Sequence, residues 1–228
     1  MLRRLIKVSA AVIGTALVVT GCAPVEMGAA AIVGNQRITI ANLDTEVTNL
    51  SQVASQYPGV VQLTATQETQ EALSWLVRFK INEALARQYG ITISPAQGAN
   101  GLQELVNAAK SEAEANGLTG VTRNEIMAAN GIPPNESSEL GRYQAIETQF
   151  IENANGGTIP TSSSKQTALD NKLEHALCVA AKNLNILINP QFGRMNYATF
   201  LVVSSPVTVS RPEGPATPAS LSGLAPAC

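Results

Sequence analysis

The sequence contains few of the residues from which catalytic and metal sites are most often built. Its 228 residues include one histidine, His175, and three cysteines, Cys22, Cys178 and Cys228. No two of these cysteines have the close spacing of a structural zinc motif. The patterns GxxxxGKS/T, GxGxxG and GxSxG, which mark nucleotide-binding loops and nucleophile elbows, are also missing. We therefore expect no metal ion, no other cofactor and no enzyme activity.

Charged and aromatic residues are scarce as well, at 14% and 4% of the chain, and the formal net charge is −2. A nucleic-acid-binding protein needs a basic face, so we expect no nucleic-acid partner. The 45% of hydrophobic residues includes many alanines. This composition favours helices that pack closely through small side chains.

The N-terminus carries the features of an export signal. Three basic residues precede an apolar run over residues 8–19, which ends at Gly21 and Cys22. The run is too short for a membrane span, which needs about 20 apolar residues. Its end, VTGC, resembles the bacterial lipobox.

That resemblance implies a diacylglycerol on the sulfur of Cys22 and cleavage just before it. Residues 1–21 would then be the signal peptide and residues 22–28 a tether, and the protein would be lipid-anchored on the extracytoplasmic face of the cell membrane. Two or more acyl chains give a firm anchor. The alternatives are a plain exported protein with a chance cysteine, or an uncleaved anchor.

Lipid on Cys22 would leave Cys178 and Cys228, and spare cysteines outside the cytoplasm usually pair. Closing a loop of about 50 residues would contribute roughly 4 kcal/mol in the chain-entropy model. Two free thiols, or a partner on another chain, are the alternatives. His175 and Cys178 share a helix face, which leaves a Cys–His nucleophile as an enzymatic alternative, although that would also need an orienting group.

Hydrophobic periodicity predicts a mainly α-helical domain over residues 29–203, with a short N-terminal β-hairpin that pairs with a strand after the last helix. Gly34 and Asn35 mark the hairpin turn. Gly90 is placed to cap the C-terminus of a long helix. SPAQ at 94–97 and TRNE at 122–125 are N-terminal capping boxes. Residues 204–228 are rich in Pro, Ser and Ala and predict a loosely ordered tail.

Three stretches carry a resemblance to a known family. AAIVGNQRITIANLDTEV, LVRFKINEALARQYGITISPAQ and LTGVTRNEIMAANGI, the last followed by a helix through Arg142 and Ile146, resemble the SurA N-terminal domain family. The likeness covers roughly residues 29–185. It implies a helical domain that holds unfolded or extended polypeptides outside the cytoplasm. The parvulin-type prolyl isomerase domain of many relatives needs about 90 further residues and histidines, so we expect no isomerase activity.

Bulky side chains would form the client-binding surface, because large apolar groups with some Met suit promiscuous binding. The candidates are Trp75, Phe79, Met127, Tyr143 and Phe150. Trp75 and Phe79 lie partly off the apolar stripe of their helix, so we expect them to be the most exposed of the five. The alternatives are that these side chains are simply core, and that the domain docks one dedicated envelope or secretion partner.

Overall fold

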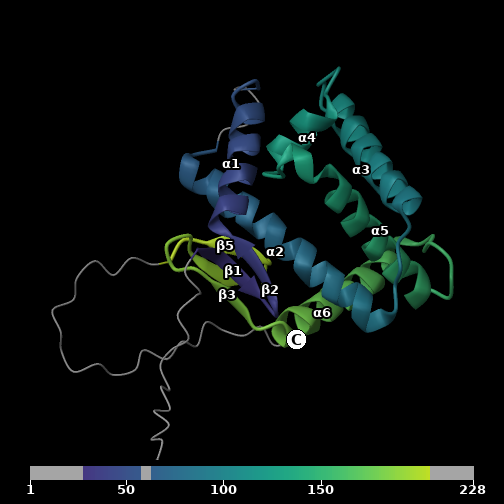
Figure 1. Cartoon of the computed structure of the whole chain (residues 1–228). Helices are drawn as coiled ribbons and strands as arrows, with labels where there is room; N and C mark the ends of the chain where they lie inside the picture. Colours follow the sequence, from purple (N-terminus) through teal and green to yellow (C-terminus); the bar gives the residue numbers. More distant parts are fainter. Residues whose placement is uncertain (1–27, 58–62, 206–228) are drawn as a thin grey trace, which may run out of the picture.

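The computed structural model describes residues 28–57 and 63–205, and these residues are mainly helical with a few short antiparallel strands. The predicted fold class is therefore confirmed. Figure 1 shows a small sheet at one side of the molecule and the helices α3, α4 and α5 on the other, with α2 running between them. The elements, in chain order, are β1 (Ala29–Val33), β2 (Gln36–Thr39), α1 (Ile40–Ala54), α2 (Ala65–Tyr89), α3 (Pro95–Ala115), α4 (Arg123–Ala129), η1 (Pro134–Glu136), α5 (Ser137–Ala154), α6 (Ser163–Asn183), β3 (Ile186–Ile188), β4 (Arg194–Asn196) and β5 (Leu201–Val203).

The N-terminal hairpin forms as predicted, with Gly34 at its turn in the left-handed region at φ +62°. β1 also pairs antiparallel with β3, Val33 lying opposite Ile186, so the sheet order is β2-β1-β3. The expected strand after the last helix thus closes the hairpin into a three-stranded sheet. The sequence of residues 199–203 favours a short strand or an extended segment, and β5 lies within this range. Its partner β4 and the hairpin that the two form were not predicted, because β4 has three residues and no alternating pattern.

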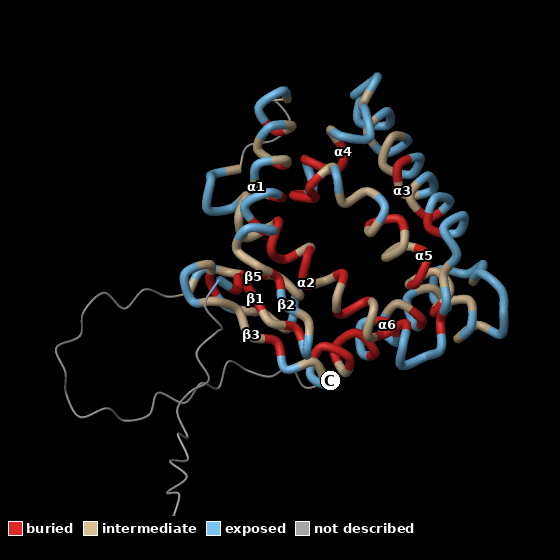
Figure 2. The backbone as a smooth tube through the Cα atoms, in the orientation of Figure 1, coloured by how far each residue is buried: buried red, intermediate tan, exposed pale blue. Residues whose placement is uncertain are grey.

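The core surrounds α2, which packs against α1, α5, α6, β1 and β5. Leu73, Val77 and Leu85 on α2 are fully or almost fully buried. Figure 2 shows buried positions concentrated along α2 and on the sides of α5 and α6 that face it, whereas much of α3 is exposed. Burial of these apolar faces is the main stabilising term for helices of this kind.

The predicted helix signals are present in the structure. Thr122 accepts from the backbone N–H of Glu125, whose side chain accepts in return from the backbone N–H of Thr122 at 2.7 Å. Ser94 and Gln97 form the same reciprocal pair at the start of α3. Gly90 ends α2 in the left-handed conformation at φ +64°. Satisfying these end groups locally sets the boundaries of the helices.

Helices α3 and α5 meet through glycines instead of large side chains. A Cβ on Gly141 would collide with the backbone oxygen of Gly98 and would lie 2.9 Å from the Cβ of Leu102. A Cβ on Gly101 would lie 2.8 Å from the backbone oxygen of Gly141. The two backbones therefore approach more closely than any residue larger than glycine would permit at these positions.

Residues 1–27, 58–62 and 206–228 lie outside the described part of the chain, and with them the predicted signal peptide, most of the tether, Cys22 and nearly all of the tail. Within residues 28–57 and 63–205, none of the helices has the length and hydrophobicity that a membrane span requires.

Candidate functional site

Three of the five bulky candidates are buried. Phe79 is 4% exposed, Phe150 is 3% exposed and Met127 is fully enclosed. The expectation that Phe79 is among the most exposed candidates is wrong. Although Phe79 lies off the main stripe of α2, a second cluster, with Met127, Ile132 and Leu140, covers it. Phe150 belongs to the main core and packs edge-on against the ring of Tyr89.

The other two candidates are half-buried and lie together. The rings of Trp75 and Tyr143 pack edge to face with their centroids 5.8 Å apart. The indole N–H of Trp75 donates to the backbone oxygen of Asn130 at 3.0 Å, which satisfies its polar group. The guanidinium of Arg78 lies 4.6 Å from the centre of the Trp75 ring, at the distance of a cation–π contact.

Tyr143 and Arg78 also line a cavity of about 620 Å³, which we call the α6 cavity. Its walls come from α2, α5, α6 and the segment between β4 and β5. Asn171, Glu174 and His175 on its rim are exposed, so the cavity opens to solvent. The volume lies in the range of pockets that hold ligands, about 300–1,000 Å³. The full lining is Arg78, Tyr143, Glu147, Asp170, Asn171, Leu173, Glu174, His175, Leu177, Cys178, Tyr197, Ala198, Thr199 and Phe200.

Glu147 is an acid of the α6 cavity with a strongly raised pKa. Burial raises its pKa to about 7, and Asp170 adds to the increase, while the hydrogen bond from Tyr143 and the charge of Arg78 oppose it. Burial also raises the pKa of Tyr143, with the neighbouring Glu147 adding to it. Tyr143 and Glu147 are four residues apart on α5 and therefore lie on one helix face. A carboxyl group that titrates near neutral pH in a cavity is a recurrent mark of functional sites.

Sequence reasoning missed Glu147, Arg78 and Asp170 as site residues. Two patterns could have indicated the two acids, although none indicates Arg78: the spacing of four between Tyr143 and Glu147, and the same spacing between Asp170 and Glu174. Each pattern places two polar groups on one face of a helix. The sequence does not show that the two faces meet around one cavity.

His175 and Cys178, which the sequence placed on one helix face, both line the α6 cavity. Cys178 is disulfide-bonded. Its sulfur therefore carries no thiolate, which a cysteine nucleophile needs. The other two cysteines, Cys22 and Cys228, lie outside the described residues, so the pairing of Cys178 with Cys228 stays a prediction.

The wall between β4 and β5 contains a strained residue. Phe200 has φ +54°, a left-handed conformation that is an outlier for a bulky side chain. Its side chain packs against the main core next to Tyr197. Strain of this kind persists only where the surrounding structure holds the residue in place. The wall is thus held to the core by aromatic packing.

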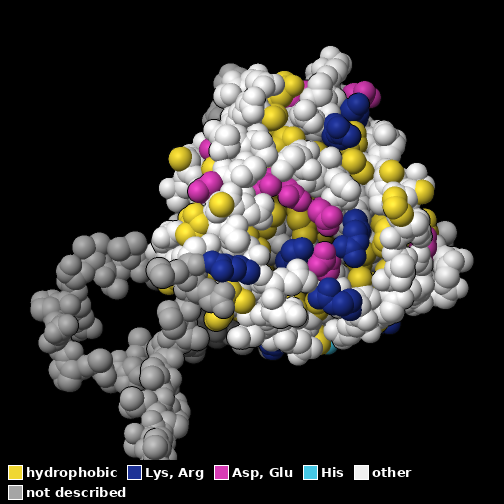
Figure 3. All heavy atoms as spheres, in the orientation of Figure 1, with side chains coloured by type: hydrophobic (Ala, Val, Ile, Leu, Met, Phe, Trp, Pro, Cys, Tyr) yellow, Lys and Arg dark blue, Asp and Glu magenta, His cyan; other side chains and the backbone are white. Residues whose placement is uncertain are grey.

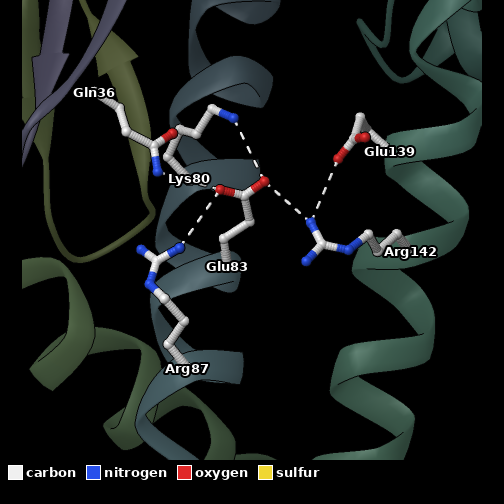
Figure 4. A network of polar contacts seen from close by, with 6 residues as sticks. All are labelled: Gln36, Lys80, Glu83, Arg87, Glu139 and Arg142. Carbon is white, nitrogen blue, oxygen red and sulfur yellow. Dashed lines mark hydrogen bonds and ion pairs between the residues drawn. The ribbon is translucent and has the colours of Figure 1, made fainter. Parts of the chain in front are cut away.

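Figure 4 shows a second polar group, which lies around Glu83 on α2. None of its labelled residues lines the α6 cavity. The Glu83 carboxylate accepts from Arg142 at 3.0 Å and from Gln36 at 3.4 Å, and it forms ion pairs with Lys80 and Arg87. Burial alone would raise the pKa of Glu83, but the two bases Lys80 and Arg142 and the Gln36 hydrogen bond outweigh it, so this pKa is lowered. The group links β2, α2 and α5, which is a structural role.

A pair of carboxyl groups joins α1 to η1. Glu46 is 3% exposed, and no hydrogen-bond donor from the described residues reaches its Oε2. Burial raises the pKa of Glu136 to about 7, and the neighbouring Glu46 and Glu139 raise it further, against the charge of Lys80. A protonated Glu136 can donate to the carboxylate of Glu46, which would give that buried oxygen its partner.

Charges of both signs mix on the face shown in Figure 3, where acidic and basic side chains cross the middle of the molecule side by side. Within residues 28–57 and 63–205, no group of three or more His, Cys, Asp or Glu side chains is arranged to hold a metal ion.

Comparisons with known proteins identify no relative. A scan against protein-family models, a search of curated proteins and a search of solved structures each returned no match. The likeness to the SurA N-terminal domain therefore remains a resemblance of sequence patterns.

Proposed function

We propose that this chain is a lipoprotein, anchored through Cys22 on the extracytoplasmic face of a cell membrane, whose helical domain binds unfolded or extended polypeptide. Binding would be reversible and would use no nucleotide. The anchor is supported by the signal-like N-terminus and its lipobox-like end. The binding role is supported by the SurA-like sequence patterns and by the α6 cavity.

The α6 cavity is the observation that carries the binding role. It combines apolar side chains such as Leu173 and Leu177 with aromatic rings and a few polar groups. A mixed lining of this kind accepts an apolar side chain while its polar groups contact the backbone or a polar neighbour. At about 620 Å³ it has room for a short stretch of chain but not for a folded domain.

Suppression of aggregation tests this function. Residues 23–228, which include every described element, are mixed at equimolar ratio with an unrelated protein as it unfolds. We expect the wild type to reduce light scattering. Ala198→Trp, on the exposed rim of the cavity, should lose most of this effect because the indole would block the entrance. Ala115→Trp, at the exposed end of α3, makes the same change away from the cavity and should leave the effect intact.

Two results would count against parts of the proposal. Equal suppression by both variants would keep the chaperone-like activity but move its site away from the α6 cavity. No suppression by folded wild type would contradict general client binding. The dedicated docking module would then be the better interpretation, and a single tight partner in a pull-down would support it.

A further inference from the structure

The α6 cavity has more acidic than basic groups. Three carboxyl side chains, Glu147, Asp170 and Glu174, line it against one guanidinium, that of Arg78. Arg78 is stacked on Trp75, and it makes no ion pair within 4 Å among the described residues. The charge of Arg78 lowers the pKa of Glu147, but this single guanidinium offsets only part of the charge of the three acids.

Glu147 and Asp170 already use part of their hydrogen-bonding capacity within the protein. Tyr143 interacts with Glu147, and the side-chain amide of Gln166 donates to an oxygen of Asp170 at 2.7 Å. These contacts hold the two carboxyl groups in place, and neither supplies a full positive charge. Two buried or half-buried acids near each other are unfavourable when both are ionised. A cation from a ligand would remove this cost.

The rest of the lining suits a long side chain with a charged end. Leu173 and Leu177 are buried at the cavity wall, and Tyr197 and Phe200 are half-buried beside them. Lysine and arginine cover apolar surface with their methylene stems and place a charge at the tip. A volume of about 620 Å³ is far larger than a single ammonium group and leaves room for the neighbouring residues of a peptide.

We infer that the α6 cavity selects polypeptide segments that contain a lysine or arginine, whose cationic group pairs with Glu147. This inference rests on the proposed function, because it names the kind of segment that the same cavity accepts. Charge complementarity and the apolar walls together favour a polypeptide with a basic side chain as the ligand.

Proton release accompanies such binding. The pKa of Glu147 is raised to about 7, so at pH 7 this group is about half protonated. A bound cation favours the ionised form and lowers that pKa. Binding at pH 7 should therefore release part of a proton per peptide, and less as the pH rises above 7. The other groups that face Glu147 are Tyr143 on its own helix, Arg78 on α2 and Asp170 on α6; the rim adds Glu174, His175 and Tyr197.

Isothermal titration calorimetry tests the inference on the full chain in phosphatidylcholine nanodiscs, with empty nanodiscs as the blank. One capped seven-residue peptide has a central lysine among Leu and Ala, and its twin has norleucine at that position. We expect the lysine peptide to bind at least about tenfold more tightly. Titrations in phosphate and in Tris, whose ionisation enthalpies differ, measure the protons released.

Substitutions test whether Glu147 causes the preference for the lysine peptide. Glu147→Gln should lose most of the preference for the lysine peptide, keeping only the share that Asp170 contributes, and should no longer release the proton of Glu147. Glu152→Gln makes the same change on the same helix outside the cavity lining, and it should behave as the wild type. If circular dichroism shows that Glu147→Gln does not fold, Asp170→Asn serves in its place and should reduce the preference by about threefold.

The outcomes separate the two proposals. Equal binding of both peptides to the wild type would overturn the selectivity and leave the proposed function standing. Binding of neither peptide would overturn both. A lysine preference in Glu147→Gln as large as in the wild type would refute the role of Glu147. Spermidine that displaces the lysine peptide at equal concentration would indicate a small-amine site instead.

Discussion

The glycine contact between α3 and α5 predicts opposite effects for two similar substitutions. In an exposed helix, Gly→Ala stabilises by roughly 0.5–1 kcal/mol because alanine loses less backbone entropy on folding. At Gly98 this gain should be realised, since an added Cβ would meet nothing closer than 3.6 Å. At Gly141 the Cβ would collide with the backbone oxygen of Gly98 and approach Leu102 to 2.9 Å.

Neither of those neighbours of Gly141 can move away by a side-chain rotation, because one is a backbone atom and the other a Cβ. Overpacking of this kind typically costs about 1–3 kcal/mol, and relieving it requires α3 and α5 to separate. We expect Gly141→Ala to lower the free energy of unfolding by about 2 kcal/mol and Gly98→Ala to raise it by up to about 1 kcal/mol.

Urea unfolding of residues 23–228 measures both variants, followed by circular dichroism and by the fluorescence of Trp75, the only tryptophan. Coincident transitions would justify a two-state analysis. A Gly141→Ala protein as stable as the Gly98→Ala protein would refute the close approach of the two helices. Loss of stability in Gly98→Ala would show that α3 lies in a different register against α5.

Two further predictions concern ionisation and covalent structure. The pKa of Glu136 in the folded protein is about 7, above its ordinary value of 4.5, so protonation of this group stabilises the fold. This contribution to stability is complete below pH 4.5 and is lost as the pH rises through 7. The melting temperature should therefore decrease between pH 5.5 and 8.5. The decrease should be smaller in Glu136→Gln, where only Glu147 still contributes to it. An equal decrease in the wild type and in Glu136→Gln would contradict the carboxyl pair. Peptide mapping without reductant should recover Cys178 linked to Cys228. Reduction of this disulfide should lower the free energy of unfolding by roughly 4 kcal/mol in the chain-entropy model. A disulfide between Cys178 and Cys22 would contradict the proposed lipid anchor.

Local signals in the sequence determined most of the secondary structure. The capping boxes at Ser94 and Thr122 and the left-handed Gly90 lie where the pattern predicted them, because a helix end is decided by hydrogen bonds among residues three or four apart. The hairpin turn at Gly34 is equally local. The N-terminal signal pattern and the cysteine count also belong to the sequence alone, and they remain the basis for the proposed location.

Tertiary structure decided which surfaces meet. Periodicity identifies the main apolar face of α2, but it does not show that α4 and α5 cover the other face, where Phe79 is buried. The α6 cavity brings together Arg78, Glu147, Asp170 and Tyr197, which are far apart in the chain and carry no common motif. The pKa of Glu147 depends on burial by those distant elements, and burial is a property of the assembled fold. The sequence therefore determined the helices and their ends, while packing alone created the cavity and its charge.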